Sequence, residues 1–158
     1  MGFSSELAAH LRRDLTRLVQ ELEAFPDEQS LWKVLPGVTN SAGNLTLHLE
    51  GNLREFIGRR LGHVVFERNR PAEFASSGVP VAELIRRTKE LRELVDGVVT
   101  AMNEEALGAA IPEEVLKVQL TAQQFLIHLY GHLNYHLGQI DYLRRIVTSG
   151  TSIELAGL

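Results

Sequence analysis

Three histidines spaced four residues apart are the residues of this sequence best suited to chemistry. His128, His132 and His136 stand in a segment that contains no proline from Thr121 to Thr148. Because residues four apart share one side of a helix, the three imidazoles would form a row along it. Neutral imidazole is a common ligand of divalent transition metals. The row is therefore a candidate metal-binding element.

The segment that must position this row is predicted to be one long helix from Thr121 to Thr148. Thr121 and Gln124 have the spacing of a capping box, in which each side chain accepts a hydrogen bond from the backbone of the other. At 3.6 residues per turn, His136 falls inside the apolar arc of this helix and His132 falls on its edge. His128 lies a further step out, toward solvent.

A second predicted helix, from Ser41 to Leu61, also places an imidazole at the boundary of the core. His48 lies at the edge of its apolar stripe, with Asn52 one turn further along the same helix. The stripe itself consists of Leu45, Leu49, Leu53, Phe56 and Ile57.

A metal site needs ligands held by fixed elements, because ordering a flexible site would cost binding free energy. Two histidines four apart on one helix and a third from a neighbouring helix meet this need, and His132, His136 and His48 fit that arrangement. The pair His128 and His132 has the same spacing and remains an alternative. Any one of these histidines alone is better explained as an ordinary side chain, hydrogen-bonded at the boundary of a helix.

Composition and the remaining motifs argue against several other classes of function. The 158 residues include no cysteine, which excludes disulfides, thiolate metal ligands and cysteine nucleophiles. The net charge of −4 gives no general electrostatic reason to bind nucleic acid. The segment from His132 to His136 lacks the glutamate that follows the first histidine of zinc proteases. Paired Glu-x-x-His motifs, Gly-x-Ser-x-Gly and a phosphate-binding glycine loop are missing too.

Two more amphipathic helices are predicted, from Ser4 to Glu23 and from Val81 to Met102. With four such helices and little strand signal, we expect an all-α fold, a four-helix bundle with long inter-helix connections, in one domain spanning residues 1–158. The polar connection from Gly62 to Pro80 could close over one end of the bundle, and the last eight residues are expected to form a loose tail. With neither a signal peptide nor a membrane-length apolar run, we expect a cytoplasmic protein without a membrane partner.

Three sequence blocks resemble the DinB/YfiT-like superfamily in order and separation across nearly the whole chain. The blocks are Asn40-Ser-Ala-Gly-Asn-Leu-Thr-Leu-His48-Leu-Glu-Gly-Asn, Arg68-Asn-Arg-Pro-Ala-Glu-Phe74 and His132-Leu-Asn-Tyr-His136-Leu-Gly-Gln139-Ile. The last of them is the most specific.

This resemblance implies a four-helix bundle that holds one divalent metal, nickel or zinc, through His48, His132 and His136. It leaves His128 outside the ligand set, as a neighbour that could border the pocket. It also implies a homodimer, since many members of the superfamily are dimeric. Some relatives are transferases or isomerases that use a low-molecular-weight thiol, namely bacillithiol, mycothiol or glutathione.

The leading functional hypothesis is thus a metal-dependent thiol transferase or isomerase acting on a small-molecule substrate, with no catalytic residue assigned. Gln139 could bind a ligand or support the site, and Asn52 is a second candidate of this kind. Arg59, Arg68 and Arg70 could contact carboxylates of a thiol cofactor, although a solvated surface role explains them better. The alternative hypotheses are a non-enzymatic, stress-associated metal-binding dimer and a helical interaction module with incidental histidines.

Overall fold

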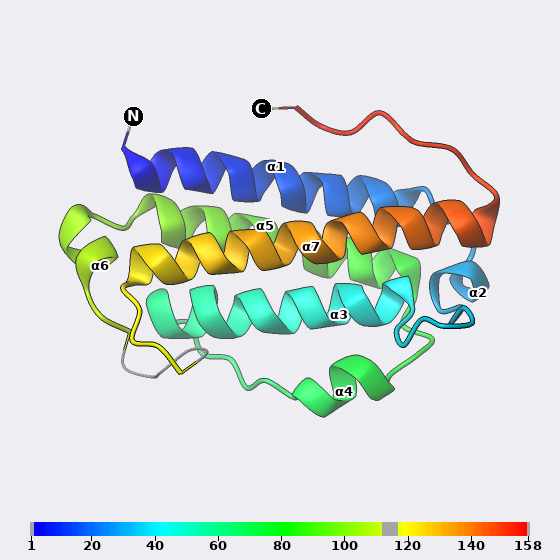
Figure 1. Cartoon of the computed structure of the whole chain (residues 1–158), viewed down its shortest axis with the longest axis horizontal. Coiled ribbons are helices and arrows are strands. Elements are labelled where there is room, and N and C mark those ends of the chain that lie inside the picture. Colours follow the sequence, from blue (N-terminus) through cyan, green and yellow to red (C-terminus); the bar gives the residue numbers. More distant parts are fainter. Residues whose placement is uncertain (1, 112–116, 158) are drawn as a thin grey trace.

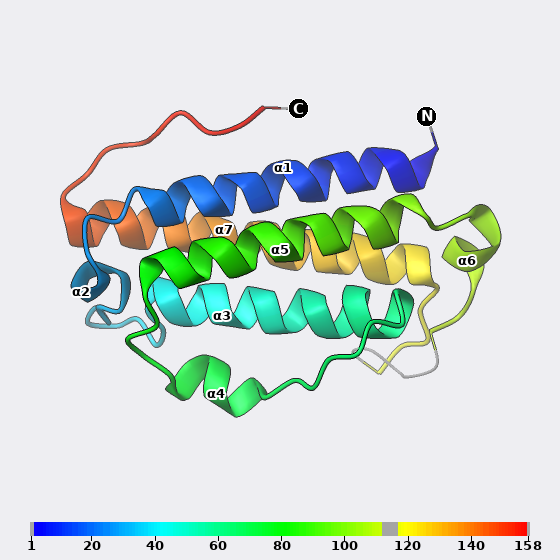
Figure 2. The ribbon, with the colours of Figure 1, turned by 180° about the vertical axis from the view of Figure 1, so that it is seen from behind.

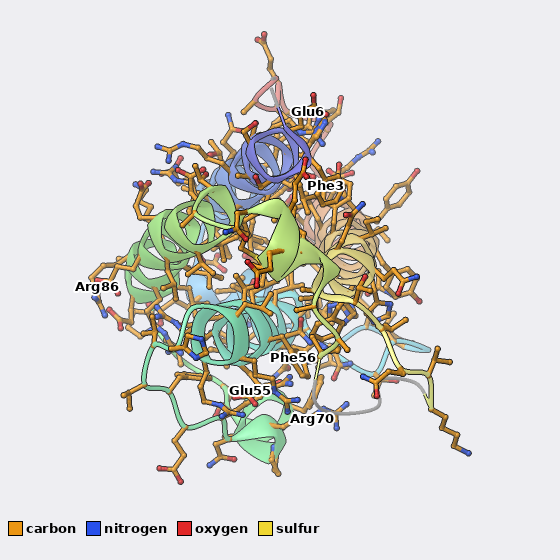
Figure 3. All side chains as sticks on the ribbon, turned by 90° about the vertical axis from the view of Figure 1, so that its left-hand side faces the viewer. Phe3, Glu6, Glu55, Phe56, Arg70 and Arg86 are labelled. Carbon is orange, nitrogen blue, oxygen red and sulfur yellow. The ribbon has the colours of Figure 1, made fainter. Side chains whose placement is uncertain are left out.

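All four segments with helical apolar periodicity form long helices, and they pack as an all-α bundle (Figure 1). The computed structural model describes residues 2–111 and 117–157. Seen along the bundle, α1 and α3 lie at opposite corners, with α5 and α7 between them on either side (Figure 3). In chain order the elements are α1 (Phe3–Glu23), α2 (Glu28–Leu31), α3 (Ala42–Leu53), the π-helix η1 (Arg54–Leu61), α4 (Arg70–Ala75), α5 (Val81–Thr100), α6 (Glu104–Gly108) and α7 (Ala122–Thr148).

Leucine repeats on the four long helices form a single core, as their spacing predicts. These side chains are almost completely removed from water, and each contributes about 1.5–3 kcal/mol of hydrophobic stabilisation relative to an exposed position. The most fully buried members are Leu11, Leu15 and Leu22 of α1, Leu49 and Leu53 of α3, Leu91, Val95 and Val99 of α5, and Leu126, Leu133 and Ile140 of α7.

The helix predicted from Ser41 to Leu61 is present, but its last eight residues are π-helical. Ser41 caps its start, where the Ser41 hydroxyl accepts a hydrogen bond from the backbone N–H of Asn44 and the Asn44 side chain accepts one from Ser41. In the π-helical part, hydrogen bonds span one residue more than in an α-helix, as between the N–H of Gly62 and the carbonyl of Ile57 at 2.9 Å. His48 lies in the regular part, α3.

Helix α7 agrees closely with its prediction. Its capping box is formed reciprocally by Thr121 and Gln124. Ser149 ends the helix in the left-handed conformation, with φ of 52°. Because the helix is continuous between these ends, His132 and His136 are held one turn apart on a rigid element.

The connection from Gly62 to Pro80 lies along the outside of α3 and does not cover an end of the bundle, contrary to the expectation (Figures 1 and 2). Its short helix α4 begins where the Asn69 side chain accepts a hydrogen bond from the N–H of Ala72, with Pro71 in the first turn. Helix α4 packs against α3, so this connection can deliver side chains to the neighbourhood of His48.

The end of the described chain is attached to α1, which corrects the expectation of a loose tail. Arg17 donates a hydrogen bond of 2.7 Å to the carbonyl of Ala156, and the N–H of Ala156 donates one of 2.9 Å to the side chain of Gln20. Both partners lie on α1, so these two bonds fix the course of the tail. Within the described residues, no helix combines the length and apolar character needed to cross a membrane.

Candidate metal centre

His48 of α3 meets His132 and His136 of α7 where the two helices pack together. One ligand nitrogen from each ring lies within 4.8 Å of those from the other two. The ring centres of His132 and His136 are 4.6 Å apart, and that of His48 is 5.1 and 5.2 Å from them. The structure therefore brings together the three histidines that the resemblance implies, while the alternative pair of His128 and His132 gains no third partner among the described residues.

Two of these rings already have the spacing of metal ligands. The Nε2 atoms of His48 and His132 are 3.2 Å apart. Two nitrogens bound tetrahedrally at 2.0–2.1 Å from a zinc ion would be about 3.3 Å apart. Imidazoles without thiolates suit zinc and nickel alike. The donor set and its spacing thus fit a divalent metal ion.

Glu73 of α4 orients the ring of His48. The Nδ1–H of His48 donates a hydrogen bond of 2.8 Å to Oε2 of Glu73, and both side chains are buried. With its proton on Nδ1, a neutral His48 ring presents the lone pair of Nε2 toward His132. A carboxylate behind a ligating histidine is a common feature of metal sites, because it fixes the ring and makes it a better donor.

Arg68 and Gly51 in turn fix Glu73. Arg68 donates to both carboxylate oxygens, at 2.7 and 2.9 Å, in a bidentate ion pair. Gly51 lies directly against the carboxylate, since a Cβ atom at this position would be 2.1 Å from Oε1 of Glu73. Only glycine leaves room for Glu73 here.

Gln139 holds the second α7 histidine from within the same helix. The Nδ1 atom of His136 and Oε1 of Gln139, three residues later, are joined by a hydrogen bond of 2.7 Å. Since the amide oxygen can only accept, His136 donates from Nδ1, and its Nε2 atom remains free for a ligand. The supporting role considered for Gln139 is therefore the one that its contact favours.

His132 has no such support. Its Nδ1 atom is buried and has no hydrogen-bond partner among the described residues. Burial, followed by the neighbouring imidazoles of His136 and His48, lowers the pKa of His132 to about 4. Burial also lowers the pKa of His48, against the opposing effect of Glu73. Both rings are consequently neutral at physiological pH, the form that binds a metal.

The other two candidates, His128 and Asn52, have different surroundings. His128 is exposed and stacks on Phe125, with ring centres 6.2 Å apart. Asn52 is buried one turn after His48, and its Oδ1 atom has no hydrogen-bond partner within the described part of the chain. Because this oxygen lacks a donor, Asn52 is still a candidate contact for a ligand.

The three candidate arginines have different surroundings. Arg68 is committed to Glu73, and Arg59 pairs with Glu55 at 2.6 Å. Arg70 is exposed and lies over the ring of Phe74, at 5.3 Å from its centre. The ring of Phe74 in turn contacts that of His48, with centres 4.9 Å apart. Arg70 therefore lies at the surface beside a ring that contacts His48, whereas Nη2 of Arg68 lies 3.5 Å from Nδ1 of His48 itself.

The part of the site that sequence reasoning missed is the role of Glu73. The sequence block that contains Glu73 indicates only the resemblance, and it suggests Arg68 only as a contact for a cofactor. One local signal was available, because Asn69 followed by Arg-Pro predicts the start of a helix. The contact between that helix and α3 depends on tertiary packing, which the local sequence does not encode.

A groove opens beside Gln139, on the surface between α7 and the segment before α3. Its volume is about 430 Å³. The polar lining includes Gln139, which bonds to His136, so the groove lies next to the histidine cluster. Its apolar lining consists of Val38, Leu45, Tyr142, Leu143 and Ile146.

A helical bundle with a three-histidine cluster between its second and fourth long helices defines a class of candidate metal-binding proteins. Within that class, a family model of the DinB superfamily matches residues 10–140. The chain belongs to the DinB superfamily. Comparison with curated proteins gives no match.

Solved structures share this fold at low sequence identity. A conserved protein from Enterococcus faecalis is 18% identical, with a TM-score of 0.77 over 95% of this chain and 99% of the other. A DinB-like protein from Bacillus cereus is 14% identical, with a TM-score of 0.68 over 92% and 91% of the two chains. A DinB-like protein from Bacillus subtilis is 16% identical, also with a TM-score of 0.68, over 96% of each. These likenesses confirm the all-α bundle.

Proposed function

We propose that this protein binds one divalent metal ion, nickel or zinc, through His48, His132 and His136, and uses it in a thiol-dependent transferase or isomerase reaction. The convergence of the three imidazoles is the observation that carries the proposal. When bound, such an ion would act as a Lewis acid that lowers the pKa of a low-molecular-weight thiol. The absence of cysteine from the chain is consistent with an external thiol as the nucleophile.

The remaining residues hold this arrangement in place. Glu73 and Gln139 fix the rings of His48 and His136, each through the nitrogen that faces away from the cluster. Asn52 has a buried oxygen that needs a donor, and a bound ligand or a water molecule would supply it. Arg70, which lies over the ring of Phe74 beside His48, would contact a carboxylate of the thiol.

The electrophilic substrate would bind in the groove beside Gln139. The groove is mostly apolar, with polar groups from Thr39, Asn40 and Gln139 at its wall. At about 430 Å³ it has the size of a typical small-molecule site. We therefore favour a small, largely apolar electrophile that meets the thiol near His136.

A structural role for the metal is the second candidate, because His48 and His132 come from different helices. Their contact would let a bound ion tie α3 to α7 without any reaction. This version predicts that loss of the ion lowers the melting temperature and changes nothing else.

Turnover by the metal-loaded protein distinguishes the two candidates. The protein would be supplied with bacillithiol, mycothiol or glutathione and with 1-chloro-2,4-dinitrobenzene, in which the thiol sulfur replaces chloride. We expect thiol-dependent chloride release that His132→Ala removes and that exposed His63→Ala retains. Metal binding without turnover for any of the three thiols, over a panel of electrophiles, would favour the structural role.

A further inference from the structure

Among the described residues, four buried side-chain nitrogen or oxygen atoms have no hydrogen-bond partner. They are Nδ1 of His10, Oε1 of Glu21, Oδ1 of Asn52 and Nδ1 of His132. Buried polar atoms are normally paired, so each of these calls for an explanation. The first two belong to α1, at the corner of the bundle opposite α3 (Figure 3). The last two belong to α3 and α7, the helices that carry the histidine cluster.

Helices α3 and α7 run antiparallel, which determines the part of α7 that Asn52 faces (Figure 1). Leu45, near the start of α3, shares a groove with Leu143, near the end of α7. Phe56, just after α3, contacts Phe125 in the first turn of α7, with ring centres 5.1 Å apart. Asn52 lies between these two contacts, one turn before Phe56.

Within this packing, Asn52 and His132 lie at the same level of the contact between the two helices. Nε2 of His132 is 3.2 Å from Nε2 of His48, and Asn52 follows His48 by four residues on the same face of α3. Side chains lean toward the N-terminus of their helix. Asn52 therefore leans back toward His48, and His132 leans toward the turn of α7 that faces Asn52. The two unpartnered atoms thus belong to one buried region.

The other two rings of the cluster each have an oxygen acceptor at Nδ1. For His48 it is the carboxylate of Glu73, at 2.8 Å, and for His136 it is the amide of Gln139, at 2.7 Å. The third ring lacks such an acceptor among the described residues. The amide oxygen of Asn52 is chemically equivalent to that of Gln139, and it needs a donor. The pattern of the first two rings indicates what the third requires.

We propose that Asn52 is the positioning residue of His132, whose Nδ1–H donates to Oδ1 of Asn52, directly or through one water molecule, when a metal ion is bound at Nε2. The inference rests on the metal binding of the proposed function and not on its thiol chemistry. A neutral imidazole has one N–H, so a ring that offers Nε2 to a metal carries its proton on Nδ1. A buried N–H without an acceptor is costly, and Asn52 supplies the acceptor.

The tautomer of His132 also explains why both atoms lack a partner. His48 donates from Nδ1 to Glu73, so the proton between the two Nε2 atoms belongs to His132. Nδ1 of His132 then carries a lone pair. A lone pair and the oxygen of Asn52 are both acceptors and cannot bond to each other. A proton on Nδ1 pairs both atoms at once, so Asn52 favours the tautomer that binds a metal.

Zinc affinity of Asn52 variants tests this role in competition titrations with a chromophoric chelator. We expect Asn52→Leu to lower the affinity about 10–100-fold, because the His132 ring loses its acceptor. Asn52→Asp keeps an oxygen there and should retain the affinity. Thr46→Val is the matched control, a buried polar group of α3 whose hydroxyl bonds to the carbonyl of Ala42. In metal-free protein, Asn52→Leu removes an unpartnered oxygen and should not lower the denaturation midpoint.

Nitrogen-15 NMR of the histidine rings supplies a readout that a purely structural role would not change. In the zinc-loaded protein we expect a slowly exchanging Nδ1–H signal from His132, which Asn52→Leu loses while those of His48 and His136 remain. Persistence of this signal in Asn52→Leu, unchanged zinc affinity in that variant, or an equal loss of affinity in Asn52→Asp would overturn the inference and leave the metal site intact. Failure of the unaltered protein to bind zinc would overturn the metal site and this inference together.

Discussion

The Nε2 atoms of His48 and His132 lie 3.2 Å apart, so in the metal-free protein one of the two must carry the proton that joins them. His48 already donates from Nδ1 to Glu73, which leaves its Nε2 as an acceptor. His132 therefore supplies the proton, and its own Nδ1 is the buried nitrogen without a partner. A metal ion bound at Nε2 of His132 would require the other tautomer of this neutral ring, with its proton on Nδ1 instead.

Metal-free protein should lose stability as the pH falls from about 6.5 to about 4. An unfolded histidine has a pKa of about 6.5, whereas burial lowers that of His132 to about 4 in the folded chain. The unfolded state thus binds more protons between these values, and the free energy of unfolding falls as the pH drops from about 6.5 to about 4. Urea unfolding with a chelator present measures this fall. It should be shallower for His132→Gln, and an equal pH dependence in that variant would refute the assignment.

Removal of the Glu73 carboxylate should weaken metal binding without removing any ligand. We expect Glu73→Ala to lower the affinity for zinc or nickel about 10–100-fold, because the His48 ring loses the acceptor that orients it. Glu73→Gln retains an acceptor and should lose less. Glu67→Ala, an exposed position in the same connection, serves as the control in competition titrations with a chromophoric chelator. Unchanged affinity in Glu73→Ala would mean that Glu73 does not position His48.

A methyl group at Gly51 of α3 should disturb the Glu73 carboxylate that orients His48. Alanine is favoured over glycine in a helix by about 1 kcal/mol, so Gly97→Ala, where the new methyl meets nothing, should be stabilising. Gly51→Ala should instead be destabilising, since its Cβ would overlap the Glu73 carboxylate. Paired denaturation curves and metal titrations check this. Stabilisation by Gly51→Ala with normal metal affinity would contradict the packing described here.

The four long helices could be predicted from sequence because each depends on local signals. The apolar spacing of α1 and α5 and the capping box at Thr121 need no knowledge of the rest of the chain. The π-helical turns of η1 differ, since the spacing of Phe56 and Ile57 is compatible with an ordinary α-helix. The attachment of Ala156 to α1 escaped prediction for a similar reason, because it depends on two contacts between distant parts of the chain.

The candidate metal site could likewise be predicted only in part from the sequence. Helical periodicity placed His132 and His136 on one face, and the resemblance added His48 and set His128 aside. Neither source gave a role to Glu73, whose carboxylate reaches His48 only because Gly51 leaves space for it. A polar connection between helices gives little indication of which of its side chains will turn inward, so the support behind His48 became visible only in the folded chain.

Calorimetric titration of chelator-treated protein with nickel and with zinc tests the metal centre most directly. We expect one ion to bind per chain. This binding should be lost in His132→Ala and retained in His128→Ala, which removes the neighbouring imidazole one turn earlier on α7. Failure of the unaltered protein to bind either ion, or binding that survives in His132→Ala at full affinity, would contradict a metal site formed by His48, His132 and His136.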